Sequence, residues 1–184
     1  MQSQYFVFNN WDEIAMYDLP ASIDYVLNKT NETQLNYVGF SMGTIAAFAM
    51  MSEIPQYNNK VKLLIALGPV AFLENMGGPL SLLTGYTNTL KFLTEILGVY
   101  EVLPSGAFMN ILTSTMCDPA VTTVAPICDN ILLSLIGLDT SLMDKKLLPR
   151  ILAHTPAGTS VQNMIHFMQA KNSGDFKCIV MVLP

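Results

Sequence analysis

One serine of the chain has the neighbours expected of a catalytic nucleophile. Residues 37 to 48 read YVGFSMGTIAAF, so that Ser41 follows Gly39 by two positions and precedes Gly43 by two. A Gly-X-Ser-X-Gly pattern can form a nucleophile elbow, a strained turn between a strand and a helix that presents the serine hydroxyl. Because the pentapeptide also occurs by chance, the alternative is a glycine-flanked serine in an ordinary turn.

The segments on both sides of this pattern favour the elbow. The apolar run Leu35–Phe40 predicts a buried strand, and residues 43–51 predict a helix directly after the serine. A second buried strand is predicted at Val61–Leu67. Two buried strands joined by a helix indicate a parallel βαβ unit with a right-handed crossover. The first part of the chain is therefore predicted to have an α/β fold.

Each residue of the predicted elbow has a role. Ser41 is the candidate nucleophile, and the backbone N–H of Met42 at the start of the helix is the candidate oxyanion donor. The helix dipole adds a positive field at that N–H. Gly39 and Gly43 are interpreted as the small residues that let strand and helix approach closely.

A serine nucleophile also needs a base and an orienting acid, which follow it in the chain in this architecture. The histidines are His154 and His166, so a triad Ser41–Asp144–His154 can be written. Neither Asp144 nor His154 follows a predicted strand, and a histidine within NMIHFMQ is more typical of a packed or surface position. The other acids between serine and histidines are Asp118, Asp129 and Asp139.

A helix and a polar loop are predicted before the elbow. Asp18 is the expected N-cap, with Pro20 in the first helical turn. The polar sequence NKTNETQ is expected to end this helix as a loop. It holds two overlapping N-glycosylation acceptors, at Asn28 and Asn31.

Composition excludes several classes of protein. Hydrophobic residues make up 51% and charged residues 12%, but each apolar run is interrupted before the roughly 18 residues that a membrane-spanning helix requires. The net charge of −5 and scattered basic residues argue against binding nucleic acid. Two histidines and three dispersed cysteines predict no metal site. Residues 1–13 lack the features of a signal peptide.

From residue 70 onward, the sequence shows helical periodicity and many methionines. The pattern fits either adaptable core packing or a mobile cap above an apolar pocket. Cys117 and Cys128 bracket a short loop here. From their spacing alone, a disulfide and two buried thiols are both open, and Cys178 is left over in either case.

Several blocks of the sequence, in the same order, resemble the acid lipase family of α/β-hydrolases, which includes secreted gastric and lysosomal lipases and similar insect lipases. The resemblance extends from about Trp11 to Phe176. The blocks are NNWDEIAMYDLPASIDYVL, LNYVGFSMGTIAAFAMMSE, LLIALGPVAFLENMGGPL, ILLSLIGLD and HTPAGTSVQNMIHFMQAKNSGDF.

The resemblance implies a serine carboxylic-ester hydrolase of lipid metabolism, a lipase acting on acylglycerols or sterol esters. It implies Ser41 as nucleophile, the amide of Met42 as an oxyanion donor, and a disulfide between Cys117 and Cys128. No metal or organic cofactor is implied. The expected location is secreted or lysosomal, with transient contact to a lipid surface. Phe40 and Met42 depart from the family, which has a polar residue before the nucleophile and glutamine after it.

The resemblance also implies a division of the chain. Residues 1–68 would be a partial α/β-hydrolase core of few parallel strands with flanking helices, residues 69–169 a mostly helical cap, and residues 170–184 a divergent tail. Family members carry a second oxyanion donor upstream and the triad Asp and His downstream. We therefore expect those groups to lie outside the 184 residues.

Two other interpretations remain open. The chain could be a catalytically inactive lipid-binding or interaction fragment that uses its apolar segments. It could also be a small intact esterase that uses His154 or His166 as base. Two strands with unpaired apolar edges would make the isolated polypeptide marginally stable and prone to aggregate.

Overall fold

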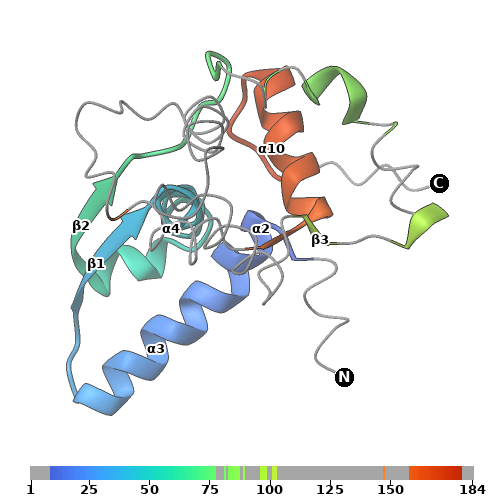
Figure 1. Ribbon diagram of the computed structural model, residues 1–184. Coiled ribbons are helices and arrows are strands. Elements are labelled where there is room, and N and C mark those ends of the chain that lie inside the picture. Colours follow the sequence, from blue (N-terminus) through green and yellow to red (C-terminus); the bar gives the residue numbers. More distant parts are fainter. Residues whose placement is uncertain are drawn as a thin grey trace. The chain divides into compact units, whose positions relative to one another are not determined.

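The computed structural model describes residues 9–77, 81, 83–87, 89, 96–98, 101–102, 147 and 158–179 (Figure 1). The chain divides into two compact units. One unit comprises Met1–Asn75 together with Gln162–Pro184, and the other comprises Met76–Val161. The first unit holds the predicted elbow.

The first helical segment begins earlier than the sequence predicts. It runs through α2 (Trp11–Glu13), a π-helical turn η1 (Ile14–Asp18) and α3 (Leu19–Thr30). The N-cap is Asn10, whose side chain accepts hydrogen bonds from the backbone of Asp12 and Glu13. The Glu13 carboxylate accepts from the Asn10 N–H at 3.2 Å, which completes a capping box. Asp18 has helical backbone angles and makes no cap, so the prediction that it starts the helix is wrong.

The end of α3 also differs from the prediction. Residues 28–30 form its last turn instead of a loop, and the Thr30 hydroxyl donates to the Val26 carbonyl at 2.8 Å. Asn31 ends the helix in the left-handed conformation, with φ 56°. A short side chain such as asparagine tolerates this conformation better than most. Asn28 and Asn31 are both exposed.

The predicted βαβ unit is confirmed. Strand β1 (Leu35–Phe40) leads through Ser41 into α4 (Met42–Glu53), and β2 (Val61–Leu67) returns parallel to β1 (Figure 1). In the register, Val38 pairs with Ile65 and Phe40 with Leu67. A short 3₁₀ helix, η2 (Pro55–Asn59), precedes β2.

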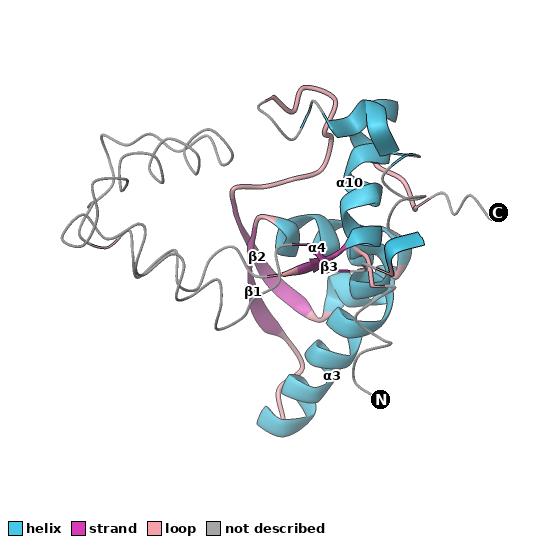
Figure 2. Cartoon of the chain, turned by 45° about the vertical axis from the view of Figure 1, so that its right-hand side comes forward, coloured by secondary structure: helices cyan, strands magenta, loops and turns pink. Residues whose placement is uncertain are grey.

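One face of this sheet packs against helices. The face that carries Leu35 and Tyr37 lies toward α4, and α3 and α4 lie on the same side of the two strands (Figure 2). The buried core between these elements contains Trp11, Ala15, Ile23, Leu27, Ile45, Ala46, Ala49, Met50, Tyr57 and Val61. Because α4 buries residues around most of its circumference, it is the central element of the core.

The prediction that both strands are buried is wrong for the part of the chain that the structure describes. The second face of the sheet carries large apolar side chains that are exposed to solvent. These are Val38 at 60%, Phe40 at 72%, Leu63 at 50%, Ile65 at 42% and Leu67 at 50%. Parallel strands with apolar side chains on both faces are expected to pack against other segments on both faces. Among the described residues, other segments pack only against the face that carries Leu35 and Tyr37.

The second unit is described only in short pieces. It contains η3 (Leu83–Tyr86) and a two-stranded antiparallel pair of β3 (Glu101–Val102) and β4 (Thr159–Ser160). The expected cap helices fall largely outside the described residues, as do Cys117, Cys128 and His154. No helix within the described ranges has the length and apolar character needed to cross a membrane.

Candidate active site

Ser41 occupies the turn between β1 and α4 in an unusual backbone conformation. Its φ is 49° and its ψ is −115°, while its neighbours belong to a regular strand and a regular helix. A residue with a side chain rarely adopts positive φ, and this pair of angles lies outside the left-handed helical region. Such strain costs on the order of 1–3 kcal/mol and persists only where the surroundings hold it. The side chain of Ser41 is exposed.

Backbone hydrogen bonds hold Ser41 on both sides. Its N–H donates to the carbonyl of Leu67, the last residue of β2, at 3.0 Å. Its carbonyl accepts from the N–H of Thr44 at 2.9 Å and from the Thr44 hydroxyl at 2.7 Å. The same hydroxyl accepts from the N–H of Val70 at 2.8 Å. The strained turn is therefore tied to the end of β2 and to the segment that follows it.

Tyr37 explains why a glycine stands at position 39. A Cβ at Gly39 would lie 2.9 Å from Cε1 of Tyr37 and 3.0 Å from the carbonyl oxygen of Gly43, both too close for ordinary contact. The Tyr37 hydroxyl donates to that same carbonyl at 2.9 Å. Burial raises the pKa of Tyr37, so the hydroxyl stays a donor. A Cβ at Gly43 would meet only the Tyr37 hydroxyl, at 3.6 Å, among the described residues.

Met42 offers its backbone N–H at the start of α4. It is the first residue of the helix, and the first amides of a helix have no partner within it. The Met42 amide and the helix dipole can stabilise a negative charge next to Ser41. The Met42 side chain is half-buried, and its sulfur accepts a hydrogen bond from Nδ2 of Asn163 at 3.0 Å.

Asn163 connects this turn to the start of the chain. It is 3% exposed and lies on α10 (Val161–Ser173). Its Oδ1 accepts from the N–H of Trp11 at 3.0 Å, while its Nδ2 donates to the sulfur of Met42. One amide side chain thus joins α10, α2 and the N-terminal residue of α4.

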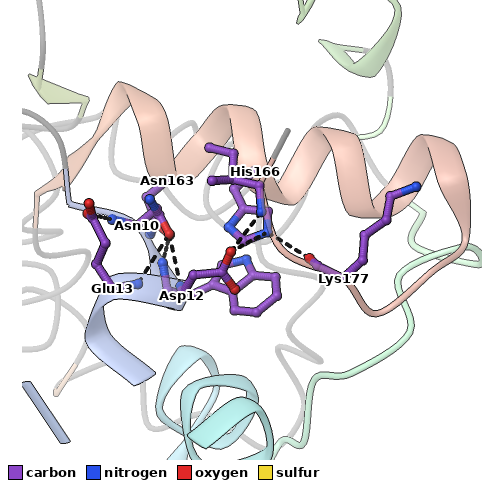
Figure 3. A network of polar contacts seen from close by, with 8 residues as sticks. Asn10, Asp12, Glu13, Asn163, His166 and Lys177 are labelled. Carbon is purple, nitrogen blue, oxygen red and sulfur yellow. Dashed lines mark hydrogen bonds and ion pairs between the residues drawn. The ribbon is translucent and has the colours of Figure 1, made fainter. Parts of the chain in front are cut away.

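His166 is packed in a separate network. Its ring is 1% exposed and stacks on Trp11, with centroids 3.8 Å apart and an interplanar angle of 12°. Nε2 lies 3.0 Å from the carbonyl of Lys177 and 3.7 Å from Oδ2 of Asp12 (Figure 3). Because a carbonyl can only accept, Nε2 carries the proton. Burial lowers the pKa of His166, against the opposing effects of the Lys177 carbonyl and Asp12.

The remaining residues singled out in the sequence do not meet Ser41 among the described residues. His154, Asp118, Asp129, Asp139 and Asp144 lie outside them. Asp12 accepts from the N–H of Ile179 at 2.7 Å and faces His166. No cluster of histidine, cysteine and acidic side chains able to hold a metal ion occurs in the part of the chain that is described.

Three residues of this site were not predicted from the sequence. They differ in how clearly the sequence indicates their role. Thr44 stands three residues after Ser41, where helix N-termini use side-chain hydroxyls, so its position is a usable signal. Tyr37 stands two residues before Gly39 and therefore on the same strand face, which also could have indicated contact. Asn163 carries no local signal, because its partners are distant in the sequence.

Comparison with known proteins identifies the class to which this fold and site belong. Residues 7–96 match the family model described as the alpha/beta hydrolase fold. The chain is 43% identical over 169 residues to Lipase 3 of Drosophila melanogaster. It is 37% identical over 169 residues to lysosomal acid lipase/cholesteryl ester hydrolase of Homo sapiens, and 37% identical over 174 residues to lipase member K of Mus musculus. The chain belongs to the α/β-hydrolases.

Within that fold, it belongs to the acid lipase family. The aligned regions cover 90% of this chain for Lipase 3, 92% for the human lysosomal acid lipase and 95% for mouse lipase member K. They cover 42%, 41% and 42% of those three relatives. The chain therefore spans about two fifths of the length of these relatives.

Proposed function

We propose that this chain belongs to a serine carboxylic-ester hydrolase that acts on neutral lipid esters, such as acylglycerols or sterol esters. Ser41 is the nucleophile, and the N–H of Met42 is one oxyanion donor. The observation that carries this proposal is the backbone of Ser41, with φ 49° and ψ −115° between a strand and a helix. The relatives named lipases support the substrate class.

The chemistry follows from the position of Ser41. Once deprotonated by a base, its exposed hydroxyl attacks the ester carbonyl, and the carbonyl oxygen becomes an oxyanion. The Met42 N–H donates to that oxyanion, and the positive end of the α4 dipole adds to its stabilisation. Collapse of the intermediate expels the alcohol, and water then releases the fatty acid from Ser41.

We propose that His166 is not the base. Its Nε2–H is committed to the Lys177 carbonyl, and its ring is stacked on Trp11. On the resemblance to the acid lipases, which carry these groups further downstream, we propose that the acid and base of the triad belong to the complete enzyme and lie outside these 184 residues. A second oxyanion donor is proposed to come from the same source.

The test uses the full-length protein that contains this chain. Hydrolysis of p-nitrophenyl butyrate and of an emulsified triacylglycerol is measured for wild type, Ser41→Ala, Ser52→Ala and His166→Phe. Ser52 is the matched control, because it is an exposed serine on the same helix. We expect Ser41→Ala to lose more than about a thousandfold in kcat, as removal of a nucleophile does. Full activity of Ser41→Ala would refute the proposal.

The other variants test the roles separately. Ser52→Ala is expected to keep wild-type kcat. His166→Phe is expected to retain activity in proportion to its folded fraction. Loss of all hydrolysis in a folded His166→Phe protein would restore His166 as the base.

A second candidate function is lipid binding without catalysis. It is favoured by the exposed apolar face of β1 and β2, which includes Phe40 next to Ser41. Displacement of a fluorescent fatty acid tests it. Binding that persists in Ser41→Ala, with no ester hydrolysis by wild type, would support this function over the first. Absence of binding at high micromolar protein would remove it.

We also propose a secreted or lysosomal location with N-linked glycans. The supporting observations are the exposed side chains of Asn28 and Asn31 and the relative named lysosomal acid lipase. After expression through a secretory pathway, peptide-N-glycosidase F should lower the mass of the wild type. The mass of Asn28→Gln/Asn31→Gln should change less on treatment. An equal change in both proteins would contradict glycosylation at these positions.

A further inference from the structure

The hydroxyl of Thr44 joins two backbone groups that are far apart in the sequence. It donates to the carbonyl of Ser41 at 2.7 Å and accepts from the N–H of Val70 at 2.8 Å. A hydroxyl has one proton and two lone pairs, so both bonds form at once. Thr44 is fully buried, so water does not replace either partner without opening the core.

The bond to Ser41 acts on the peptide unit that holds the candidate oxyanion donor. The carbonyl of Ser41 and the N–H of Met42 belong to the same peptide group. That group is planar and trans, so the direction of its carbonyl fixes the opposite direction of its N–H. Whatever holds the Ser41 carbonyl therefore orients the Met42 N–H.

The backbone bond from the Thr44 N–H to the Ser41 carbonyl, at 2.9 Å, is available to any residue except proline at this position. The hydroxyl bond is specific to threonine or serine. The Ser41 carbonyl thus accepts two hydrogen bonds from Thr44, one from its N–H and one from its hydroxyl. The hydroxyl is in turn held by the hydrogen bond that it accepts from the Val70 N–H. Val70 lies two residues after Gly68, which has φ 56° and directly follows the last residue of β2.

We propose that Thr44 is a positioning residue that orients the Met42 N–H toward the oxyanion and couples the segment after β2 to the turn at Ser41. The proposal rests on the proposed function of Ser41 and adds a residue to it. Thr44 does not touch the reacting atoms. It acts through the peptide between Ser41 and Met42.

Three variants separate this role from a simple structural one. Thr44→Val keeps the shape and removes the hydroxyl, and Thr44→Ser restores the hydroxyl. Thr30→Val is the matched control, because the Thr30 hydroxyl makes a similar bond to the preceding turn of α3, at Val26. Thr30 also belongs to the glycosylation acceptor at Asn28, so all proteins in this comparison carry Asn28→Gln. Each variant is measured for ester hydrolysis in the full-length protein.

For Thr44→Val, we expect kcat to fall about tenfold while KM stays within about twofold. Complete removal of an oxyanion donor costs about 100-fold to 1,000-fold in kcat, and a misdirected donor costs less. Thr44→Ser is expected to recover most of the loss, and Thr30→Val to match wild type. A Thr44→Val enzyme with wild-type kcat, or one in which only KM changes, would overturn the proposal.

Amide hydrogen exchange gives a readout that does not depend on catalysis. In Thr44→Val, the amides of Val70 and Ser41 should exchange at least about tenfold faster, while that of Leu35, which donates to the Lys60 carbonyl at the far end of the strand pair, stays unchanged. Faster exchange at Val70 alone, at none of these, or equally at all three would contradict the coupling. If Ser41→Ala hydrolyses esters as well as wild type does, the proposed function fails. The amide exchange rates of Ser41 and Val70 then still decide whether the Thr44 hydroxyl restrains the turn at Ser41.

Discussion

The imidazole of His166 lies parallel to the indole of Trp11, with ring centroids 3.8 Å apart. Phe176 stacks near the same indole, at 5.5 Å. The contact joins α10 to the first turn of α2, and the Lys177 carbonyl fixes the proton of His166 on Nε2. A histidine held neutral in this way makes stability depend on pH.

Replacement of His166 by phenylalanine should weaken that dependence. Burial holds the pKa of His166 in the folded state below the unfolded value of about 6.5. The unfolded chain therefore binds the extra proton first as pH falls. Stability is unaffected by this group above about pH 6.5 and declines below it, toward the lowered folded-state pKa. Thermal unfolding between pH 7.5 and 5.5 should show a smaller decline for His166→Phe than for wild type.

The pH dependence can be separated from a general loss of stability in His166→Phe. Phenylalanine keeps a ring against Trp11 but loses the hydrogen bond to the Lys177 carbonyl, so the free energy of unfolding at pH 7.5 should fall by about 0.5–1.5 kcal/mol. Burial raises the pKa of Glu13, which acts in the opposite direction but is common to both proteins. An unchanged decline with pH in the variant would show that His166 is not responsible.

The two glycines of the elbow should differ in their tolerance of a methyl group. Gly39→Ala places Cβ 2.9 Å from Tyr37 and should cost about 1–3 kcal/mol of unfolding free energy, as overpacking does. Gly43→Ala has room and lies in a helix, so it should be neutral or stabilising by up to about 1 kcal/mol. Urea unfolding measures both. Similar losses for the two variants would contradict the assignment of crowding to Gly39.

The helix start at Asn10 can be tested against the predicted start at Asp18. Asn10→Ala removes the acceptor of two backbone N–H groups and should cost about 0.5–2 kcal/mol. Asp18→Ala should change stability by less than about 0.5 kcal/mol, since Asp18 makes no cap. Chemical unfolding of both variants provides the comparison. A larger loss for Asp18→Ala would place the cap there after all.

The exposed face of the sheet predicts the behaviour of the isolated chain. Ile65 is 42% exposed, so Ile65→Thr should change unfolding free energy by less than about 0.5 kcal/mol while lowering dye binding and aggregation. Ile45 is fully buried in α4, and the same substitution there should cost more than about 1 kcal/mol, because it buries a hydroxyl. Fluorescence of anilinonaphthalene sulfonate and static light scattering report the exposed face.

The two isoleucine variants control each other. Equal destabilisation would mean that the second face is covered in solution. Unchanged dye binding in a folded Ile65→Thr chain would mean that the dye binds elsewhere.

The local sequence pattern determined much of the segment that contains β1, Ser41, α4 and β2. The runs Leu35–Phe40 and Val61–Leu67 coincide with β1 and β2, and the helix after Ser41 was predicted to within two residues at either end. These elements are strongly apolar and bounded by glycine or polar residues, so short-range preferences and hydrophobic burial agree. The glycine-serine-glycine spacing also placed Ser41 at the strand-to-helix turn.

The local sequence pattern did not predict where the first helix begins or that one face of the sheet is exposed. Asp18 and Pro20 are good signals for a helix start, yet the helix already begins at Trp11, because Asn10 caps it and Trp11 packs into the core. The strands were predicted as buried from their composition alone. Composition reports how apolar a strand is, whereas burial depends on which other segments lie against it.

The sequence by itself determined the strand–serine–helix unit and the family to which it is similar. Only the tertiary structure decided what holds that unit in place. Thr44 meets the N–H of Val70 across 26 positions, and Asn163 meets Trp11 across 152. Such contacts leave no periodic trace in the sequence, because a single side chain makes each of them and its partner is a backbone N–H, which every residue except proline has. The strained turn at Ser41 persists because these distant groups, once folded together, restrain it from both sides.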